Sequence, residues 1–244
     1  MWPKNLPPNT NKPPVSILTP TYNRRKFLPA CIACIQAQDY PRDRLEWVVL
    51  DDGSEPVWDV LAPYEKELNI RYIRSEQKMT IGAKRNRLHQ EARGEILVNM
   101  DDDDYYYPDR VKHAVSTIIG RKANIVGSSC NTLFFTDDAS VWEVGPYGLN
   151  HATFGTMAYT KKYAITHPCD ETVAFAEEVQ FTNTYKEPLV QLDYRKVMVV
   201  MCHKENTFSK NKLRMEGNPK VRKTGMKLKT LIGDKKLRDF YASC

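Results

Sequence analysis

The sequence predicts an α/β fold in which a mostly parallel central sheet is flanked by helices, followed by a more irregular α+β half. Short apolar runs alternate with helical patterns over the first 130 residues, which is typical of stacked βα units. This regular alternation fades in the second half. The 244 residues, 41% of them hydrophobic and 27% charged, suit one large domain with a buried core.

Apolar stretches bounded by turn residues mark the strands of the first half. We expect them at residues 15–20, 45–50, 70–73, 95–100 and 124–127. Helical patterns occupy the intervals, at residues 24–38, 57–68, 81–92 and 108–119. Proline fits a helix only in its first turn. Pro29 must therefore lie early in its helix, and Pro108 is expected at the first helical position.

Composition divides the chain into three segments. Residues 1–14 are polar and hold five prolines, so we expect a flexible proline-rich leader. Residues 15–209 are expected to form a single domain with two halves, 15–130 and 131–209. Residues 210–244 hold eleven basic and three acidic residues. We expect them to form a basic tail, which is either a solvated, partly helical terminus or a surface for an anionic partner.

The sequence gives no sign of export or membrane insertion. Its apolar runs are far shorter than the roughly 20 residues of a membrane-spanning helix, and the leader lacks the apolar core of a secretory signal. We therefore expect a cytoplasmic protein. The six cysteines are too few and too scattered for a disulfide scaffold. Cys31 and Cys34 fall within an apolar helical pattern and are expected to be buried thiols.

Two acidic clusters follow two different predicted strands. Asp51 and Asp52 end the second strand, and four aspartates at 101–104 end the fourth. The carboxyl ends of parallel strands form the ligand crevice of an open sheet, so both clusters are expected to open onto one site. Four adjacent carboxylates repel one another, which favours a bound Mg²⁺ or Mn²⁺ shared with substrate phosphates. The alternative is a solvated acidic turn in which Asp104 caps the next helix.

Two further stretches bring polar and basic groups to the same edge. Residues 19–24 (Thr-Pro-Thr-Tyr-Asn-Arg) follow the first strand and supply hydroxyls, an amide and an arginine where a nucleotide could lie. Residues 82–86 (Gly-Ala-Lys-Arg-Asn) open a helix. A helix start flanked by Lys84 and Arg85 can hold a donor phosphate. The alternative for this stretch is an ordinary basic helix surface.

Together, these motifs resemble the inverting family 2 glycosyltransferases with the GT-A nucleotide-sugar-binding fold. The likeness rests on T-P-T-Y-N-R, V-V-L-D-D-G-S, G-A-K-R-N and V-N-M-D-D-D-D-Y-Y-Y-P-D-R, in this order. Residues 153–162 are similar to the family's acceptor-side strand and turn, and residues 203–207 resemble its late histidine motif. The resemblance implies that residues 15–130 form the nucleotide-sugar half and residues 131–209 the acceptor half.

The resemblance also implies roles on the donor side. Thr19 and Asp52 match positions that contact the nucleotide base, and Tyr22 lies beside them. We expect Asp52 to accept the imide N–H of a uracil-type base, which favours a UDP-sugar donor. Removing that partner would leave a buried carboxylate unpaired, at a cost of roughly 1–3 kcal/mol.

A metal site is implied by the same likeness. The family's D-x-D pattern, counted back from Pro108, falls on Asp101 and Asp103. Asp103 is then the main metal ligand, whereas Asp101 or Asp102 serves the donor's ribose or the metal. His203 is expected to ligate the metal or to contact a phosphate. The implied cofactor is Mn²⁺ or Mg²⁺.

The family's catalytic base usually stands in an E-D pair on a helix beneath the acceptor. The best match is Glu177-Glu178, so Glu178 is expected to be the base, although aspartate is commoner there. A metal would neutralise the departing nucleoside diphosphate while one carboxylate deprotonates the acceptor hydroxyl, so a single displacement with inversion is the simplest chemistry. The alternative is a pair of solvated glutamates near a helix start.

Two other functions remain as alternatives. A sugar nucleotidyltransferase would want a glycine-rich loop after the first strand, where residues 19–24 contain no glycine. A non-catalytic protein could bind nucleic acid or an anionic membrane through the basic tail, but this leaves the acidic clusters unexplained. We therefore expect a nucleotide-sugar donor and a glycan or other hydroxyl acceptor as partners. We expect no nucleic acid, and only weak peripheral membrane contact through the tail.

Overall fold

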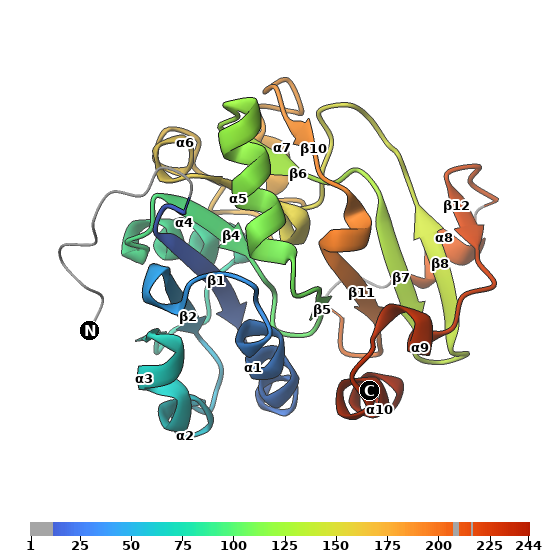
Figure 1. Ribbon diagram of the computed structural model, residues 1–244, viewed down its shortest axis with the longest axis horizontal. Coiled ribbons are helices and arrows are strands. Elements are labelled where there is room, and N and C mark those ends of the chain that lie inside the picture. The colour runs from blue at the N-terminus through green and yellow to red at the C-terminus, as the bar shows by residue number, and fades with distance from the viewer. Residues whose placement is uncertain (1–11, 207–209, 216) are drawn as a thin grey trace.

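Two β-sheets lie side by side in the computed structural model, which describes residues 12–206, 210–215 and 217–244 (Figure 1). The first sheet has the strand order β10-β6-β9-β4-β1-β2-β3. These strands are β1 (Val15–Thr21), β2 (Leu45–Asp51), β3 (Ile70–Arg74), β4 (Ile96–Asn99), β6 (Ile125–Gly127), β9 (Ala158–Thr160) and β10 (Val190–Gln191). Only β9 runs antiparallel to its neighbours. The predicted mostly parallel sheet is confirmed.

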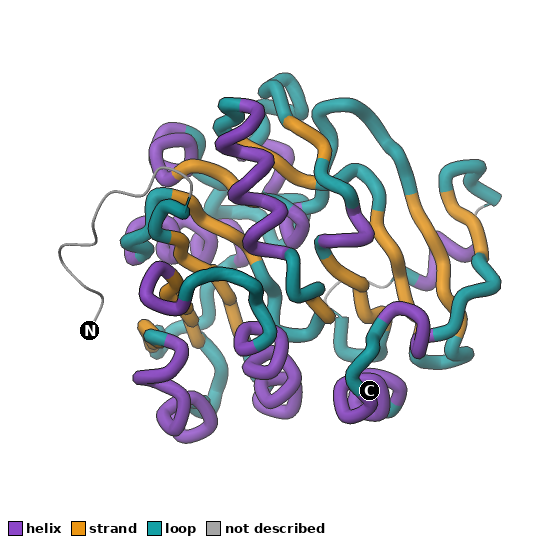
Figure 2. The backbone as a smooth tube through the Cα atoms, viewed as in Figure 1, coloured by secondary structure: helices purple, strands orange, loops and turns teal. Residues whose placement is uncertain are grey.

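Helices cover both faces of the first sheet (Figure 2). Helices α1 (Leu28–Gln36) and α5 (Arg110–Arg121) pack against one face, and α4 (Ile81–Glu91) and α6 (Lys161–Thr166) pack against the other. Consecutive strand residues point to opposite faces. Ile17 therefore contributes to one apolar cluster and Leu18 to the other, and β1 is buried along its whole length.

The second sheet has the order β12-β8-β7-β11-β5 and is mostly antiparallel. Its strands are β5 (Tyr105–Tyr106), β7 (Asn131–Phe135), β8 (Ser140–Val144), β11 (Met198–Cys202) and β12 (Val221–Lys223). Strand β5 comes from the first half of the chain, whereas β9 and β10 of the first sheet come from the second half. The two expected halves, 15–130 and 131–209, therefore share both sheets.

Prolines explain where the helices differ from the expected ranges. The helix expected at 24–38 is a 3-10 turn (Arg25–Phe27) followed by α1, with Pro29 in the first turn of α1 as expected. The helix expected at 57–68 is divided into α2 (Trp58–Leu61), a 3-10 turn (Ala62–Tyr64) and α3 (Glu65–Leu68). Pro63 lies in that turn and has no N–H for a helical hydrogen bond. Helix α5 begins at Arg110, so the expectation that Pro108 is its first residue is wrong.

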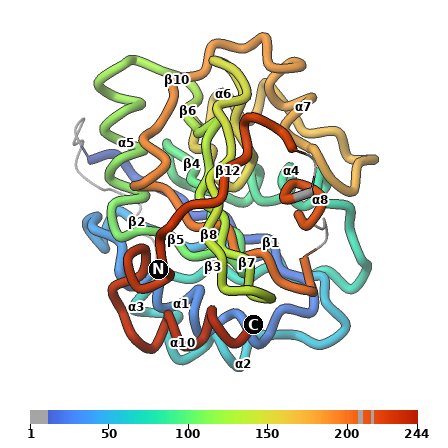
Figure 3. The backbone as a smooth tube through the Cα atoms, turned by 90° about the vertical axis from the view of Figure 1, so that its right-hand side faces the viewer, coloured from blue at the N-terminus to red at the C-terminus, as the bar shows by residue number. Residues whose placement is uncertain are grey.

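Much of the basic segment 210–244 is packed against the rest of the protein (Figure 3). It contributes α8 (Asn211–Met215), β12, α9 (Leu228–Leu231) and α10 (Lys235–Ala242). Strand β12 pairs with β8, and the side chains of Ile232 and Tyr241 are fully buried. The described part of this segment therefore continues the folded domain beyond the expected boundary at residue 209.

The described end of the expected leader packs against the fold, and the cysteines form no disulfide. Residues 1–11 of the leader lie outside the described residues, while Pro13 is buried and its carbonyl accepts a hydrogen bond from Tyr40. All six cysteines are free thiols, and both Cys31 and Cys34 are buried, as expected. Within the part of the chain that is described, no helix has the length and apolar character needed to cross a membrane.

Candidate active site

A cleft of about 930 Å³ opens where β1 and β4 end. Its walls come from the loops after these two strands, the first turn of α4, a short 3-10 turn (Phe154–Thr156), and the segment that leads into α7 (Glu178–Phe181). The Thr80 hydroxyl caps α4 by accepting the Ala83 N–H at 3.3 Å, which fixes the helix start at the cleft. This is the sheet edge at which the strand pattern predicts a ligand site.

The first two aspartates of the acidic loop have different surroundings. Asp101 Oδ1 lies 2.9 Å from Nη2 of Arg85. Asp102 is 5% exposed, and among the described residues its Oδ2 has no hydrogen-bond partner. Burial, and then the charge of Asp103, raise the pKa of Asp102 well above its usual value. A buried carboxylate oxygen without a partner in the wall of a cleft is a free position for a ligand.

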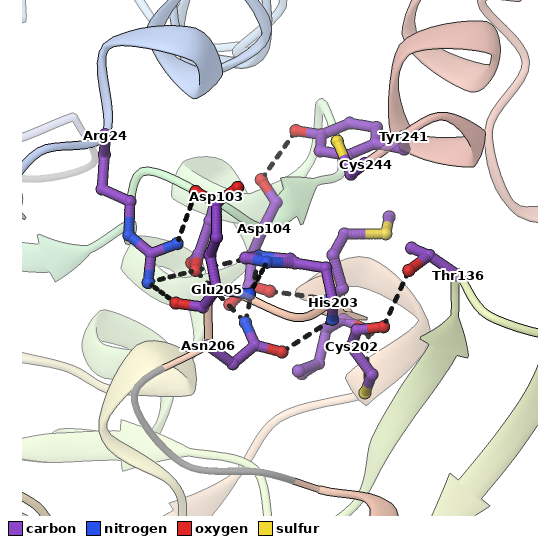
Figure 4. Close-up of polar contacts among 12 residues, drawn as sticks. Arg24, Asp103, Asp104, Thr136, Cys202, His203, Glu205, Asn206, Tyr241 and Cys244 are labelled. Atoms are coloured by element: carbon purple, nitrogen blue, oxygen red, sulfur yellow. Dashed lines mark hydrogen bonds and ion pairs between the residues drawn. The ribbon is translucent and has the colours of Figure 1, made fainter.

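Asp103 lies at the centre of a polar cluster, which Figure 4 shows. Its Oδ2 is 3.2 Å from Nε2 of His203, accepts a hydrogen bond from Asn206 Nδ2 at 3.3 Å, and is 3.6 Å from Nη2 of Arg24. Burial would raise the pKa of Asp103, but His203 and Arg24 outweigh it and hold that pKa below its usual value. Asp103 therefore remains ionised despite its burial.

Asp104 fixes the loop to the rest of the fold. Its Oδ1 accepts the Met201 N–H of β11 at 2.8 Å, and its carbonyl oxygen accepts the Tyr241 hydroxyl of α10 at 2.9 Å. The side chain is buried and makes no cap on α5, whose preceding residue, Asp109, also makes no side-chain cap. The interpretation of Asp104 as the cap of a solvated turn is therefore wrong.

Arg85 connects the acidic loop to the segment before α7. It is 3% exposed, and its Nε lies 3.2 Å from Glu177 Oε1 while its Nη2 pairs with Asp101. Burial would lower the pKa of Arg85, but Asp101 and Glu177 hold it above its usual value. Nη1 has no hydrogen-bond partner among the described residues. Arg85 is thus a buried cation in the cleft wall and not part of an ordinary basic helix surface.

Glu178 lines the cleft at the start of α7 and is partly buried. Burial raises the pKa of Glu178 to about 7, and the neighbouring charge of Glu177 adds to this effect. A carboxyl group that titrates near neutral pH can take up and release a proton under physiological conditions. Glu177 is itself buried and paired with Arg85. The two glutamates are therefore not a solvated pair.

The residues expected to contact the nucleotide base lie at different depths. The Tyr22 ring lines the cleft, with Nζ of Lys78 4.4 Å and Nζ of Lys84 5.4 Å from its centroid. Asp52 does not line the cleft: its Oδ2 accepts the Met79 N–H at 2.7 Å, and its Oδ1 pairs with Lys84. Burial lowers the pKa of Lys84. Asp52 therefore does not line the cleft itself, but it contacts two residues that do, Lys84 and Met79.

Thr19 is enclosed in the core, contrary to the expectation that it contacts a base. Its hydroxyl donates to the carbonyl oxygen of Met100 at 2.7 Å and accepts the Trp47 Nε1–H at 2.8 Å. The residue is 0% exposed and does not line the cleft. Thr19 joins β1, β2 and the start of the acidic loop.

The expected metal ligands are only partly brought together. Asp103 and His203 are in contact, whereas Asp101 pairs with Arg85. In the described residues, no group of three or more histidine, cysteine, aspartate or glutamate side chains is arranged to hold a metal ion. Mg²⁺ and Mn²⁺ commonly use one or two protein ligands and complete their coordination with substrate phosphates and water. The donor set of Asp103 and His203 fits a metal of that kind, and the unpaired Asp102 Oδ2 belongs to the preceding residue.

Several cleft residues were not singled out by the sequence analysis. Asn206 lies within the histidine motif, so its position could have been found from the resemblance. Lys78 and Lys210 lie in basic stretches without a motif, and only the fold brings them to the cleft.

A comparison with protein families identifies the chain. The family model described as Glycosyl transferase family 2 matches residues 16–166, which is more than half of the chain. The chain belongs to glycosyl transferase family 2. The matched part of this family 2 chain contains the acidic loop and Arg85 and ends before Glu178 and His203.

Curated relatives of this family 2 chain come from bacteria and archaea. The poly(ribitol-phosphate) beta-N-acetylglucosaminyltransferase TarS of Staphylococcus aureus strain MW2 is 26% identical over 175 residues, which are 68% of this chain and 30% of TarS. Glycosyltransferase AglE of Haloferax volcanii is 28% identical over 123 residues, 48% of this chain and 39% of AglE. The chain therefore spans well under half the length of these relatives.

Solved structures share the fold of this family 2 chain. TarS 1–349 from S. aureus in complex with UDP-GlcNAc superposes with a TM-score of 0.62 at 18% identity, covering 77% of this chain and 58% of that one. The mannosyltransferase PcManGT of Pyrobaculum calidifontis, in complex with GDP-Man and Mn²⁺, superposes with a TM-score of 0.64 at 19% identity, covering 84% and 61%. The expected GT-A fold is confirmed.

Proposed function

We propose that this protein transfers a sugar from a nucleotide-sugar donor to a hydroxyl acceptor with the help of a divalent cation. One observation carries the proposal. A single cleft is lined by the ionised Asp103, by the unpaired carboxylate oxygen of Asp102, and by Glu178, whose pKa is about 7; His203 does not line the cleft but contacts Asp103 from the buried side. Family membership supports the same reaction.

The donor lies in the part of the cleft between Tyr22 and the acidic loop in this proposal. The Tyr22 ring offers an aromatic face for the base, and Asp102 Oδ2 is free to accept a ribose hydroxyl. Lys84 and the free Nη1 of Arg85 supply positive charge for the phosphates. We propose a UDP-sugar, since TarS is solved with UDP-GlcNAc. The GDP-Man complex of PcManGT makes a guanine donor the competing outcome of the test.

Asp103 and His203 would hold the Mn²⁺ or Mg²⁺ ion in this scheme. When bound there, the cation neutralises the negative charge that develops on the departing diphosphate. Arg24 contacts the same carboxylate, and Lys210 adds positive charge near it. These contacts keep Asp103 ionised and its carboxylate at the cleft before a ligand arrives.

Glu178 is the proposed base for the acceptor hydroxyl. Its raised pKa makes it a better proton acceptor than an ordinary glutamate, and at neutral pH a large share of it remains ionised. Arg85 holds the neighbouring Glu177 in place, so the segment before α7 is tied to the acidic loop. With Glu178 as the one proposed base, we propose a single displacement with inversion at the anomeric carbon.

The proposal is tested by donor hydrolysis with the purified chain. UDP-GlcNAc, UDP-glucose and GDP-mannose are incubated with Mn²⁺, with Mg²⁺ or with a chelator, and the release of nucleoside diphosphate is measured. We expect metal-dependent release from a UDP-sugar, its loss in Asp103→Ala, and no change in Asp109→Ala, which replaces an exposed aspartate outside the cleft. Release that is unaffected by the chelator and by Asp103→Ala would contradict the proposal.

A further inference from the structure

The chain carries its excess positive charge on one segment. Residues 217–244 hold eight basic and two acidic residues, so their net charge of +6 equals that of the whole chain. Figure 3 looks at the side of the protein where this red segment crosses from β12 to α10. We define the basic face as Lys220, Arg222, Lys223, Lys227, Lys229 and Lys236, all of which are exposed.

Little of this charge is neutralised within the protein. Arg222 pairs with Glu143, and Lys220 Nζ donates to the Tyr147 carbonyl at 3.4 Å. In the part of the chain that the structure describes, Lys227, Lys229 and Lys236 make no ion pair. Exposed cations carried on one segment repel one another unless an anionic partner covers them.

The shape and chemistry of the basic face favour a broad anionic surface over a small ligand. None of its residues lines either of the two cavities described, and five of its six members are lysines, which interact as mobile point charges without the paired geometry of arginine. A cluster of this size is typical of contacts with anionic lipid headgroups. A separate phosphate-binding pocket is therefore not indicated.

Nucleic acid fits the basic face less well. Single-stranded nucleic acid is usually bound by aromatic side chains on which the bases stack, together with basic groups. The exposed large hydrophobic side chains, Leu149, Ile165, Phe175 and Val179, all lie outside the basic segment. Within the segment, Leu231, Leu237 and Phe240 pack against the core. Two aromatic rings beside the face, Tyr147 and Trp142, are half-buried, and Nζ of Lys220 and of Lys223 lies over them, 5.5 Å and 6.0 Å from their centroids. Among the described residues, the segment therefore offers mainly charge and has no exposed aromatic side chain of its own.

We propose that the basic face docks the protein reversibly onto an anionic phospholipid surface. The contact is electrostatic, because the apolar side chains of α9 and α10 are committed to the core. No residue of the basic face lines the cleft. The proposal is independent of the reaction proposed for the cleft.

The test uses the full chain and vesicles in a co-sedimentation assay. Vesicles of phosphatidylcholine are compared with vesicles that contain about 30% phosphatidylglycerol, a fraction that gives a substantial negative surface potential. We expect binding to the anionic vesicles alone. Raising the salt from about 0.1 M to about 0.5 M should release the protein, because the screening length falls from about 10 Å to about 4 Å.

Matched charge variants assign the binding to this face. The triple variant Lys227→Glu/Lys229→Glu/Lys236→Glu should bind at least about tenfold more weakly, as expected for the loss and reversal of three surface charges. The control is Lys66→Glu/Lys162→Glu/Lys186→Glu, which changes the net charge equally at exposed lysines on other elements. Thermal unfolding of both variants verifies that they are folded.

Three outcomes would overturn the proposal. The first is equal loss of binding in the two triple variants, and the second is binding to neutral vesicles as strong as to anionic ones. The third is retention of a single-stranded RNA oligonucleotide through the basic face without vesicle binding, which would assign the face to nucleic acid. None of these outcomes depends on the activity of the cleft.

Discussion

Replacement of Glu178 is the most direct test of the catalytic site. With a pKa of about 7, only about a tenth of this carboxyl is ionised near pH 6 and about nine tenths near pH 8. A base acts in its ionised form, so the rate of transfer should rise roughly tenfold across this interval. A glutamate at its usual pKa of 4.5 would be almost fully ionised throughout. Glu178→Gln keeps the shape but cannot accept the proton, so turnover should fall by roughly 10²–10⁴-fold.

The assay measures initial rates against pH for the wild type and for variants of α7. Donor affinity, measured by calorimetry, should change little in Glu178→Gln. Glu177→Gln should move the midpoint of the profile to lower pH, because the charge of Glu177 is one cause of the raised pKa of Glu178. Gln180→Ala, at an exposed position of the same helix, is the control. A wild-type profile that is flat between about pH 6 and pH 8, or a fully active Glu178→Gln, would refute the assignment. A product that retains the donor's anomeric configuration by NMR would refute the single displacement.

Three further outcomes are expected. Asp103→Ala should remove the part of donor binding that Mn²⁺ strengthens while leaving a cooperative thermal transition, and wild-type protein treated with a chelator should behave in the same way. Asp52→Asn should lower the free energy of unfolding by roughly 3–5 kcal/mol, because it leaves the buried Lys84 ammonium without its carboxylate. Chemical denaturation measures this loss. The double variant Lys84→Met/Asp52→Asn, which removes the ammonium as well, should lose less stability, and an equal or greater loss in the double variant would contradict the reasoning. Tyr241→Phe removes the hydrogen bond to the Asp104 carbonyl and should cost about 0.5–1.5 kcal/mol of stability, with a weaker metal response in a Mn²⁺ titration as its second readout.

The periodic part of the fold could be predicted from the sequence because each strand carries its own signal. The run Val-Val-Leu before Asp51 is buried on both faces of β2, as a continuous apolar run in a parallel sheet should be. The second sheet could not be predicted in the same way. Strands β5 and β12 are two and three residues long, and they form because residues distant in sequence pair with them.

The sequence predicted where the candidate site lies, but it predicted fewer of the contacts that its side chains make. A strand end fixes the edge of the sheet, which places the acidic loop at the cleft. It does not fix the direction of each side chain, and this is why Thr19 points into the core and Asp52 towards Lys84. The pairs Asp103–His203 and Arg85–Glu177 join residues 100 and 92 positions apart. Local sequence patterns carry no signal for contacts of that range.

The hydrogen bond between Asp104 and Tyr241 spans 137 positions, and this separation sets the order in which the protein matures. Domains form from the N-terminal side as the chain leaves the ribosome, so the acidic loop emerges well before α10 can dock on it. Strand β11, whose Met201 N–H binds the side chain of Asp104, is also synthesised late. A nascent chain therefore has strands β1 to β4 before it has a finished cleft. Incomplete products of synthesis that end before β11 accordingly lack both His203 and the contact that holds the Asp104 side chain.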